Sequence, residues 1–345
     1  MFKFANLLLA AFLMVAIPSV TLSASAVEAR TLRLGIITPP PHKWTKTAAT
    51  IAKALQQETD GALELAIFPS GQLGNEAQML QLLQTGAIDF AFLTTSELAN
   101  RLIEFSAFYT PYIAKNASHA ACILRGTVAT DILKTASKIG VTGMGYGMAG
   151  MRQIVSRQKI KQPEDLKGLK VRVTADLPLT DFWKLAGAAP TAIPLSALYD
   201  AFANGQIDAM HIDFENTLRL KFYKHAQAVL HSDHMIFPMV ALASTKSWQT
   251  LSDTQRALIQ RLFDTHLNAL LNSYASADSA FKKSLIAQGV QVDTIPQSFF
   301  TDVAKAWSAR WQKRTPFVAS LKAEAETMSS EQLCTGENRE PKSDR

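Results

Sequence analysis

Arg172 is the residue of this sequence whose type and position most clearly indicate ligand chemistry. It lies in residues 163–173, Pro-Glu-Asp-Leu-Lys-Gly-Leu-Lys-Val-Arg-Val. The proline and the two acids suit a short helical turn, and Gly168 then releases the chain into an alternating strand. On that strand Arg172 points away from the apolar face, near the carboxyl end where open α/β sheets bind ligands. Arg172 is therefore a candidate clamp for a carboxylate, and the alternative is a surface arginine in a helix-to-strand connection.

A second arginine, Arg152, follows a glycine-rich run. Residues 145–150 read Gly-Tyr-Gly-Met-Ala-Gly and match the G-x-G-x-x-G pattern of dinucleotide-binding loops. That function requires a helix that opens on the last glycine and holds a pyrophosphate on its amides, but the residues after Gly150 look extended. The run instead predicts a hinge where the chain crosses between two lobes, with Arg152 just beyond it.

Histidines and an aspartate raise the question of a metal. His211 and Asp213 flank Ile212 on the opposite face of a predicted strand, where they could reach a ligand or a metal ion. Two donors on one strand fall short of a metal site. Residues 231–234, His-Ser-Asp-His, have neither a glutamate base nor the i, i+4 spacing of a helical zinc pair. We therefore predict no metal and no cofactor.

Strands and helices alternate along the chain that must position these residues. Alternating or apolar runs predict strands at residues 32–36, 63–67, 88–93, 141–144, 169–173, 207–213 and 235–244. Helical spacing predicts helices at residues 44–55, 79–83, 117–138, 179–185, 196–202, 252–289 and 298–311. Such alternation predicts a parallel sheet covered on both faces, with Ile37, Thr94, Thr95 and Ser96 at its ligand-facing tips.

One predicted helix is unusually long. Ser252 and Gln255 form a capping box, and apolar residues repeat with helical spacing as far as Gly289. At 1.5 Å per residue this helix reaches about 50 Å, enough to lie along two lobes. The two expected lobes comprise residues 30–150 with 240–280 (lobe I) and residues 151–239 with 281–320 (lobe II and C-terminal helices).

The N-terminus has the pattern of a secretory signal. Lys3 precedes an apolar run at residues 7–20, and small residues follow, so that we expect residues 1–29 to be removed by cleavage after Ala26 or Ala29. The apolar run is shorter than the roughly 20 residues needed to span a bilayer, which argues against an uncleaved anchor. No later segment is apolar enough to span, and the mature protein is expected to be exported and soluble.

Composition limits the classes of partner. The net charge is +6, but the sequence has no run of basic residues with interleaved aromatics, so a nucleic-acid partner is not expected. The excess of positive charge favours the attraction of anions. Cys122 and Cys334 are far apart, and an oxidising compartment permits a disulfide between them. Two unpaired cysteines are at least as well supported, because a domain this apolar does not need a disulfide. Residues 329–345 predict a disordered tail.

Several segments, in order, resemble the extracytoplasmic solute-binding proteins of tripartite ATP-independent periplasmic (TRAP) transporters, the DctP type. The resemblance covers about residues 32–315 and is carried by residues 34–44, 68–74, 152–153, 163–173, 187–191 and 221–223. It implies a periplasmic location and a two-lobed α/β clamp of the periplasmic-binding-protein kind, with a long helix spanning both lobes. It also implies a protein without enzymatic activity that delivers a ligand to an ion-driven membrane permease.

The resemblance assigns roles to both arginines. Arg172 stands in the G-L-K-x-R-V motif, whose arginine forms a two-pronged salt bridge with the ligand carboxylate, and Arg152 corresponds to a second cation just past the hinge glycines. A guanidinium offers a rigid fork that matches a carboxylate, and the resulting hydrogen bonds are charge-assisted.

The sequence departs from the family pattern at the expected ligand site. Ile212 replaces an asparagine that usually contacts the ligand, and His211 replaces the glutamate before it. Ile37 and Thr94 occupy positions where some members present a polar or acidic group, and Leu195 replaces a frequent phenylalanine. The predicted ligand-binding residues are Arg172, Arg152, Ile212, His211, Asp213, Thr94, Thr95, Ile37 and Leu195. We expect a monocarboxylate with a mostly apolar body, with a 2-oxo acid as one candidate, and a dicarboxylate or a sugar acid as the competing ligand.

Two other functions stay open from the residues alone. The first is a secreted hydrolase, but the sequence contains no G-x-S-x-G elbow and no pair of acids at a spacing that suits a general acid and base. Catalytic triads can, however, be scattered in sequence. A periplasmic sensor would use the same fold to present its ligand to a signalling partner. Neighbouring genes for permease subunits would favour transport, and a gene for a sensor kinase would favour signalling. For transport we expect a monomer that acts with the permease subunits.

Overall fold

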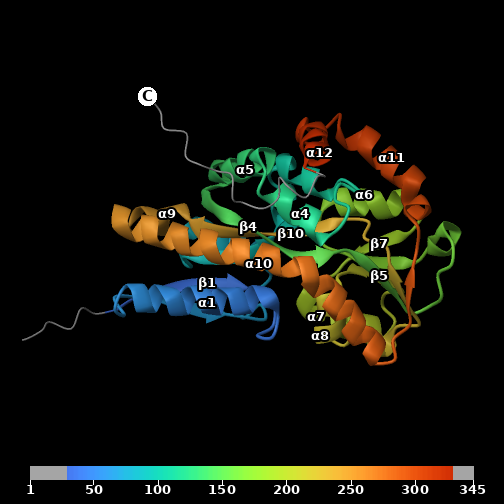
Figure 1. Ribbon diagram of the computed structural model, residues 1–345, viewed down its shortest axis with the longest axis horizontal. Coiled ribbons are helices and arrows are strands. Elements are labelled where there is room, and N and C mark those ends of the chain that lie inside the picture. The colour runs from blue at the N-terminus through green and yellow to red at the C-terminus, as the bar shows by residue number, and fades with distance from the viewer. Residues whose placement is uncertain (1–28, 329–345) are drawn as a thin grey trace, which may run out of the picture.

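The computed structural model describes residues 29–328 of the chain, so the predicted tail and all but the last residue of the predicted signal lie outside the described residues. Two β-sheets flanked by helices form two lobes (Figure 1). The first sheet has the strand order β2-β1-β3-β10-β4 and consists of β1 (Arg30–Ile36), β2 (Leu63–Phe68), β3 (Phe90–Thr94), β4 (Val141–Met151) and β10 (Ile236–Ser244). The second has the order β11-β9-β5-β8-β6-β7 and consists of β5 (Gln153–Ser156), β6 (Lys170–Val173), β7 (Ala189–Ala192), β8 (Ala209–Ile212), β9 (Ala228–His231) and β11 (Val292–Thr294).

Helices cover both sheets. The α-helices are α1 (Lys43–Glu58), α2 (Glu76–Thr85), α3 (Thr95–Ala99), α4 (Ala117–Leu124), α5 (Thr127–Lys134), α6 (Leu177–Leu185), α7 (Leu195–Ala203), α8 (Phe214–Arg219), α9 (Thr245–Gln249), α10 (Asp253–Ala287), α11 (Thr301–Trp311) and α12 (Phe317–Thr327). The 3₁₀ segments are η1 (Ile103–Tyr109), η2 (Thr135–Ile139), η3 (Pro163–Leu166), η4 (Phe222–His225) and η5 (Gln297–Phe300).

The first sheet is mixed rather than parallel. Strands β2, β1 and β3 are parallel, as predicted, because a helix crosses over between each strand and the next. Strand β10 returns from the second sheet and pairs antiparallel with both β3 and β4. The prediction of a wholly parallel sheet is therefore wrong, because alternation of strands and helices along the sequence does not show from which direction a returning strand enters.

The glycine-rich run, residues 145–150, lies inside β4 and is paired with β10. A Cβ atom on Gly147 would lie 2.7 Å from Cδ2 of Leu270, so the glycines let α10 approach the strand closely. The dinucleotide interpretation fails on its own criterion, because the strand continues past the last glycine instead of a helix opening there. Only Gly150 lies beside the crossing to the second sheet, which follows at Arg152.

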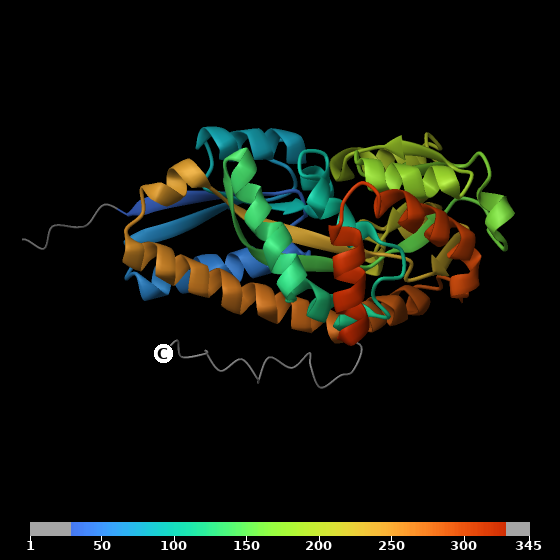
Figure 2. The ribbon, with the colours of Figure 1, turned by 90° about the horizontal axis from the view of Figure 1, so that it is seen from above.

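Several segments connect the lobes. Strand β4 passes into β5 at Arg152, and β9 returns to β10 through residues 232–235. Helix α10, 35 residues long, packs against α1 and β4 of the first lobe and α8 of the second, and Figures 1 and 2 show it along one side of both. The predicted capping box of Ser252 and Gln255 is present. Over residues 29–328, no helix combines the length and the apolar character that a bilayer crossing requires.

The predicted helix over residues 117–138 is divided at Gly126 into α4 and α5, with η2 after them. The carboxylate of Glu324, in α12, accepts hydrogen bonds from the amides of Thr127 (2.7 Å) and Val128 (3.1 Å) and so caps α5. A Cβ atom at Gly126 would lie 2.6 Å from that carboxylate. The break therefore depends on a helix about 200 residues farther along the chain.

Cys122 is buried in α4 and is not a free thiol. The alternative of two unpaired cysteines is therefore wrong for Cys122, and Cys334 lies outside the described residues.

Candidate functional site

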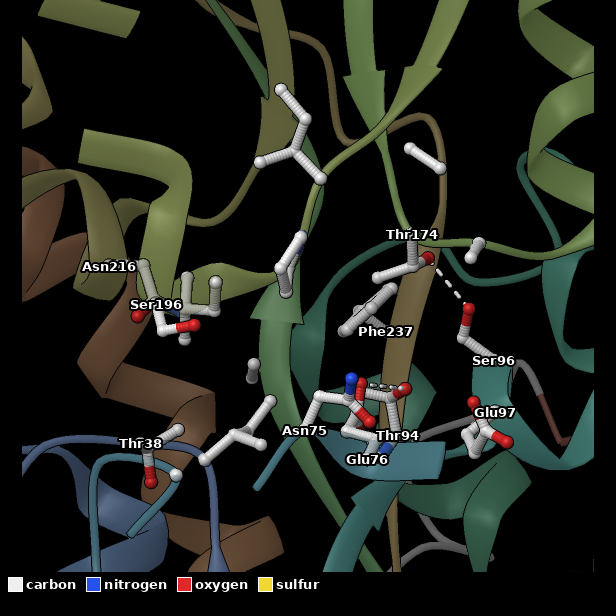
Figure 3. Close-up of a pocket in the computed structure, with 18 of the residues that line it drawn as sticks. Thr38, Asn75, Glu76, Thr94, Ser96, Glu97, Thr174, Ser196, Asn216 and Phe237 are labelled. Atoms are coloured by element: carbon white, nitrogen blue, oxygen red, sulfur yellow. Dashed lines mark hydrogen bonds between the residues drawn. The ribbon is translucent and has the colours of Figure 1, made fainter. Parts of the chain in front are cut away.

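A cavity of about 220 Å³ is lined by residues of both lobes (Figure 3). The first lobe contributes the end of β1, the start of α2 and the end of β3, and the second contributes β6, the β7–α7 connection, β8 and α8. Six of the nine residues predicted from the sequence lie in its wall: Arg172, Arg152, Ile212, Thr94, Ile37 and Leu195. Thr95, His211 and Asp213 do not line the cavity.

Arg172 lies on β6 and is 3% exposed. Its Nε donates a hydrogen bond to the carbonyl oxygen of Ile193 (2.8 Å), which orients the guanidinium. Burial and the nearby charge of Arg152 together lower the pKa of Arg172 to about 10, while the charges of Glu76 and Asp176 oppose the shift. Within residues 29–328 Arg172 forms no ion pair, so its charge is uncompensated by any direct carboxylate contact.

Arg152 lies where the chain crosses between the lobes. Its amide donates to the carbonyl oxygen of Met235 on the returning crossing (2.8 Å), which joins the two segments. Its Nη1 lies 2.7 Å from Oδ2 of Asp213, with exposed side-chain fractions of 2% and 0%. The centre of the guanidinium lies 3.3 Å from the ring centroid of Phe237, which also lines the cavity. Burial lowers the pKa of Arg152 to about 10, against the attraction of Asp213.

Asp213 is the counter-ion of Arg152 rather than a wall residue. Besides the ion pair, its Oδ1 accepts a hydrogen bond from the amide of Asn216 (2.7 Å) and its Oδ2 accepts one from Nδ2 of Asn216 (2.8 Å). Asp213 therefore caps α8 and holds Asn216, whose side chain does line the cavity. The resemblance associates position 211 with a glutamate, but His211 is not the counter-ion of Arg152. The carboxylate that pairs with Arg152 belongs to Asp213, two residues later.

His211 faces the second lobe's interior. Its Nδ1 lies 2.9 Å from Nε2 of His234, whose Nδ1 lies 2.7 Å from Oγ of Ser232. Burial lowers the pKa of His234 to about 3 and that of His211 well below its ordinary value, so both rings are neutral near pH 7. Thr95 is also turned inward, with its hydroxyl 2.8 Å from that of Tyr109. Across residues 29–328, no three side chains among His, Cys, Asp and Glu gather as metal ligands would.

Glu76, which sequence reasoning missed, is the first residue of α2 and lines the cavity. Its Oε1 accepts a hydrogen bond from the amide of Thr94 (2.5 Å), and the hydroxyl of Thr94 donates to its Oε2 (3.1 Å; Figure 3). The surrounding wall removes the carboxyl from bulk water and raises its pKa to about 7; the two bonds from Thr94 oppose this shift. Glu76 directly follows Asn75, the N-cap of α2, and this position is the sequence feature that could have identified it. It places an acidic residue at a helix start that faces the ligand-binding edge of the sheet.

The two lobes are hydrogen-bonded to each other beside the cavity. Oδ2 of Asp176, in the second lobe, accepts hydrogen bonds from the hydroxyls of Ser96, in the first lobe, and Thr174. Burial raises the pKa of Asp176 to about 6, against these bonds. At a second place Oε1 of Glu215, in α8, accepts a hydrogen bond from the amide of Lys43, at the start of α1 (3.0 Å). The lobes are therefore in contact beside the cavity.

Comparison with known proteins adds family information to this geometry. Residues 34–315 match the family described as bacterial extracellular solute-binding protein, family 7, or DctP. The chain is 26% identical over 283 residues to the sialic acid-binding periplasmic protein SiaP of Vibrio cholerae, covering 81% of this chain and 87% of SiaP. It is 27% identical over 239 residues to the 2,3-diketo-L-gulonate-binding periplasmic protein YiaO of Escherichia coli, covering 69% of this chain and 73% of YiaO.

Solved structures show the same fold. A TRAP periplasmic solute-binding protein from Bradyrhizobium, in complex with galacturonate, superposes with a TM-score of 0.81 at 26% identity, covering 86% of this chain and all of that one. Another from Shewanella oneidensis, with bound succinate, superposes with a TM-score of 0.82 at 22% identity, covering 88% of this chain and all of that one. The two-lobed α/β fold expected from the sequence is confirmed.

Proposed function

The chain belongs to the DctP family of bacterial extracellular solute-binding proteins, and from this premise we propose that it captures an organic acid in the periplasm and delivers it to an ion-driven TRAP membrane permease. It is a solute-binding protein and not an enzyme. The relatives named above bind sialic acid and a diketo sugar acid, and the solved neighbours hold galacturonate and succinate. A carboxylate is the group common to these ligands.

Arg172 is the proposed carboxylate clamp, and its environment is the observation that supports the proposal most. It is a nearly fully buried arginine that lines a cavity between lobes and forms no ion pair within residues 29–328. Keeping a charge away from water is costly unless an opposite charge compensates it. A bound carboxylate supplies that charge and fits the planar fork of the guanidinium. Arg152 adds positive potential, although Asp213 already neutralises it in part.

Closure of the lobes is the proposed mechanism of capture. The crossings at Arg152 and at residues 232–235 are the segments about which the lobes would rotate, rather than the paired glycines of β4. The contacts of Ser96 with Asp176 and of Lys43 with Glu215 join the lobes and form only when they meet. A ligand that touches both walls stabilises this closed state, which the permease then recognises.

The proposal is tested by calorimetry with D-galacturonate, succinate, sialic acid and 2,3-diketo-L-gulonate. Micromolar binding corresponds to about 8 kcal/mol, and removal of one partner from a buried charge pair costs roughly 2–5 kcal/mol. We therefore expect Arg172→Lys and Arg172→Met to abolish measurable binding of whichever acid the wild type takes. Arg261→Lys, at an exposed ion pair on α10, is the matched control and should bind as the wild type does. Near-normal affinity in the Arg172 variants would remove Arg172 from the site.

A further inference from the structure

The second lobe meets the first beside the cavity through the segment that connects β6 with α6. Nδ2 of Asn100, at the end of α3 in the first lobe, donates a hydrogen bond to the carbonyl oxygen of Ala175 (2.5 Å). The hydroxyl of Ser96, also in α3, lies 2.6 Å from that of Thr174 (Figure 3) and donates a hydrogen bond to Oδ2 of Asp176. Thr174 and Ala175 line the cavity, whereas Asp176 joins the lobes without lining it.

The carboxyl group of Asp176 is withdrawn from water in this closed arrangement. Asp176 is 3% exposed and forms no ion pair within residues 29–328. Its Oδ1 accepts a hydrogen bond from the amide of Leu179 (2.9 Å) and its Oδ2 accepts one from the hydroxyl of Thr174 (2.7 Å), both in the second lobe. Among the described residues, only the hydrogen bond from Ser96 comes from the first lobe. Separation of the lobes would remove this donor and admit water, so the burial of Asp176 depends on closure.

Two titratable groups on neighbouring elements act on Asp176. Helix α6, which Asp176 caps, packs against β6, β7, η1 and α11, and β7 has no titratable residue. Arg172 on β6 attracts the charged carboxylate, and Tyr109 on η1 stays neutral because burial raises its pKa. Three charged residues on α3, η1 and α11 are paired with other partners: Glu97 with Arg101, Glu104 with Lys138 and Arg310 with Asp181.

Burial outweighs the other influences on the carboxyl group. It raises the pKa of Asp176 from 3.8 to about 6, against the three hydrogen bonds and the charge of Arg172. In the open form, with the carboxyl group in water, the pKa returns towards its ordinary value. A ligand carboxylate on Arg172 would offset the attraction of that cation and raise the pKa of Asp176 further. Between about pH 4 and about pH 6 the closed form therefore holds a proton that the open form lacks.

We propose that Asp176 is a proton-linked positioning residue: it holds α3 of the first lobe against the second lobe through Ser96, and it takes up a proton when the lobes close over a bound carboxylate. The inference rests on the proposed function, because it requires a ligand that stabilises the closed form. Since only the closed form binds this proton, acid favours closure, and the affinity for the ligand rises as the pH falls.

Two other groups titrate where the lobes meet. Burial raises the pKa of Glu76, in the cavity wall, to about 7, so closure around it adds a proton uptake of the same sign. His42 lies 3.6 Å from Glu215 across the other contact between the lobes, and burial lowers the pKa of His42, which gives a proton release of the opposite sign. The pH profile of the wild type is therefore a sum, and the part due to Asp176 is isolated by comparison with a variant at each pH.

Asp176→Asn removes the ionisable group and keeps an oxygen for the amide of Leu179. The measured quantity is the association constant of the wild type divided by that of the variant, from calorimetry at pH 8, 7, 6 and 5. The probe is D-galacturonate or, if it binds more tightly, sialic acid or 2,3-diketo-L-gulonate, each with a single carboxylate that stays ionised in this range. Relative to pH 8, we expect the quotient to be nearly unchanged at pH 7, about 2-fold higher at pH 6 and about 10-fold higher at pH 5.

Two further variants test the position of Asp176 between the lobes. Asp181→Asn is the matched control, the same substitution farther along α6 at an acid paired with Arg310, and its quotient should not change with pH. Ser96→Ala removes the donor from the first lobe and leaves the cap of α6 in place. Because a hydrogen bond to a carboxylate is stronger than one to a neutral carboxyl group, the loss of affinity in Ser96→Ala should be at least about 2-fold greater at pH 8 than at pH 5.

The outcomes separate this inference from the proposed function. A quotient for Asp176→Asn that stays constant from pH 8 to pH 5 would overturn the inference, since loss of a helix cap alone changes the affinity by the same factor at every pH. Equal losses of affinity in Ser96→Ala at pH 8 and pH 5, or a pH-dependent quotient for Asp181→Asn, would overturn it as well. If the wild type binds none of the four acids at any pH, the proposed function fails, and this inference fails with it.

Discussion

The buried ion pair between Arg152 and Asp213 gives the sharpest test of how the site is built. The change is Asp213→Asn, which removes the charge but keeps an oxygen that accepts the amide of Asn216 and so preserves the cap of α8. Both side chains of the pair are almost completely buried. The variant therefore leaves a buried guanidinium without its counter-ion.

The size of the effect follows from the burial of Arg152. Even with Asp213 in place, burial lowers the pKa of Arg152 from its ordinary value to about 10, which corresponds to about 3 kcal/mol against the charged form at 1.36 kcal/mol for each pH unit. Removal of one partner of a buried pair costs about 3–5 kcal/mol more. For a chain of this size that loss lowers the midpoint of thermal unfolding by on the order of 10 °C.

The measurement is thermal and urea unfolding followed by circular dichroism. The control is Asp131→Asn, which breaks an exposed ion pair with Lys134 of nearly the same length, 2.8 Å, and should change the free energy of unfolding by less than about 1 kcal/mol. The double variant Asp213→Asn with Arg152→Met removes both charges and should recover most of the stability. Equal effects of Asp213→Asn and Asp131→Asn would show that the buried pair does not hold this region together.

Three further predictions concern close packing, a buried hydrogen bond and pH. Gly150→Ala should lower the free energy of unfolding by about 1–3 kcal/mol more than Gly140→Ala does. Both glycines have φ near +75°, but only at Gly150 would the new Cβ atom meet a side chain, at 2.1 Å from Asp278. Equal midpoints of urea unfolding for the two variants would contradict this. Tyr274→Phe removes the hydroxyl that donates to Glu215 (2.5 Å) and should lower the free energy of unfolding by about 1–3 kcal/mol, measured with urea; an unchanged value would show that Glu215 is satisfied without it. Burial lowers the pKa of His234 from 6.5 to about 3, so below pH 6.5 the unfolded chain binds a proton that the folded chain does not. The free energy of unfolding of the wild type, relative to that of His234→Gln, should therefore fall as the pH drops from 6.5 towards 4 and stay constant above pH 7. A difference between the two proteins that does not change with pH would refute the neutral buried ring.

Local patterns were enough to predict the two cationic residues and the main elements. Period-two alternation in residues 169–173 predicted the face of β6 to which Arg172 belongs, and helical spacing with a capping box predicted α10. These features depend on neighbours within a few residues, so the sequence contains all the information that they require. Ile212 is different, because the family resemblance and not the strand pattern predicted it at the ligand site; alternation only separated it from His211 and Asp213, which do not line the cavity.

Contacts between distant segments were decided only by the tertiary structure. The counter-ion of Arg152 lies 61 residues away, at Asp213, and the amide that binds Glu76 lies 18 residues away on another element. Alternation predicts which face of a strand a side chain occupies, but the partner on the opposing element depends on how the lobes pack. The polarity of the cavity could not be deduced from Ile212 and Ile37, because Glu76 and Asn216 enter it from helix starts, and the direction that a helix start faces depends on how the helix packs.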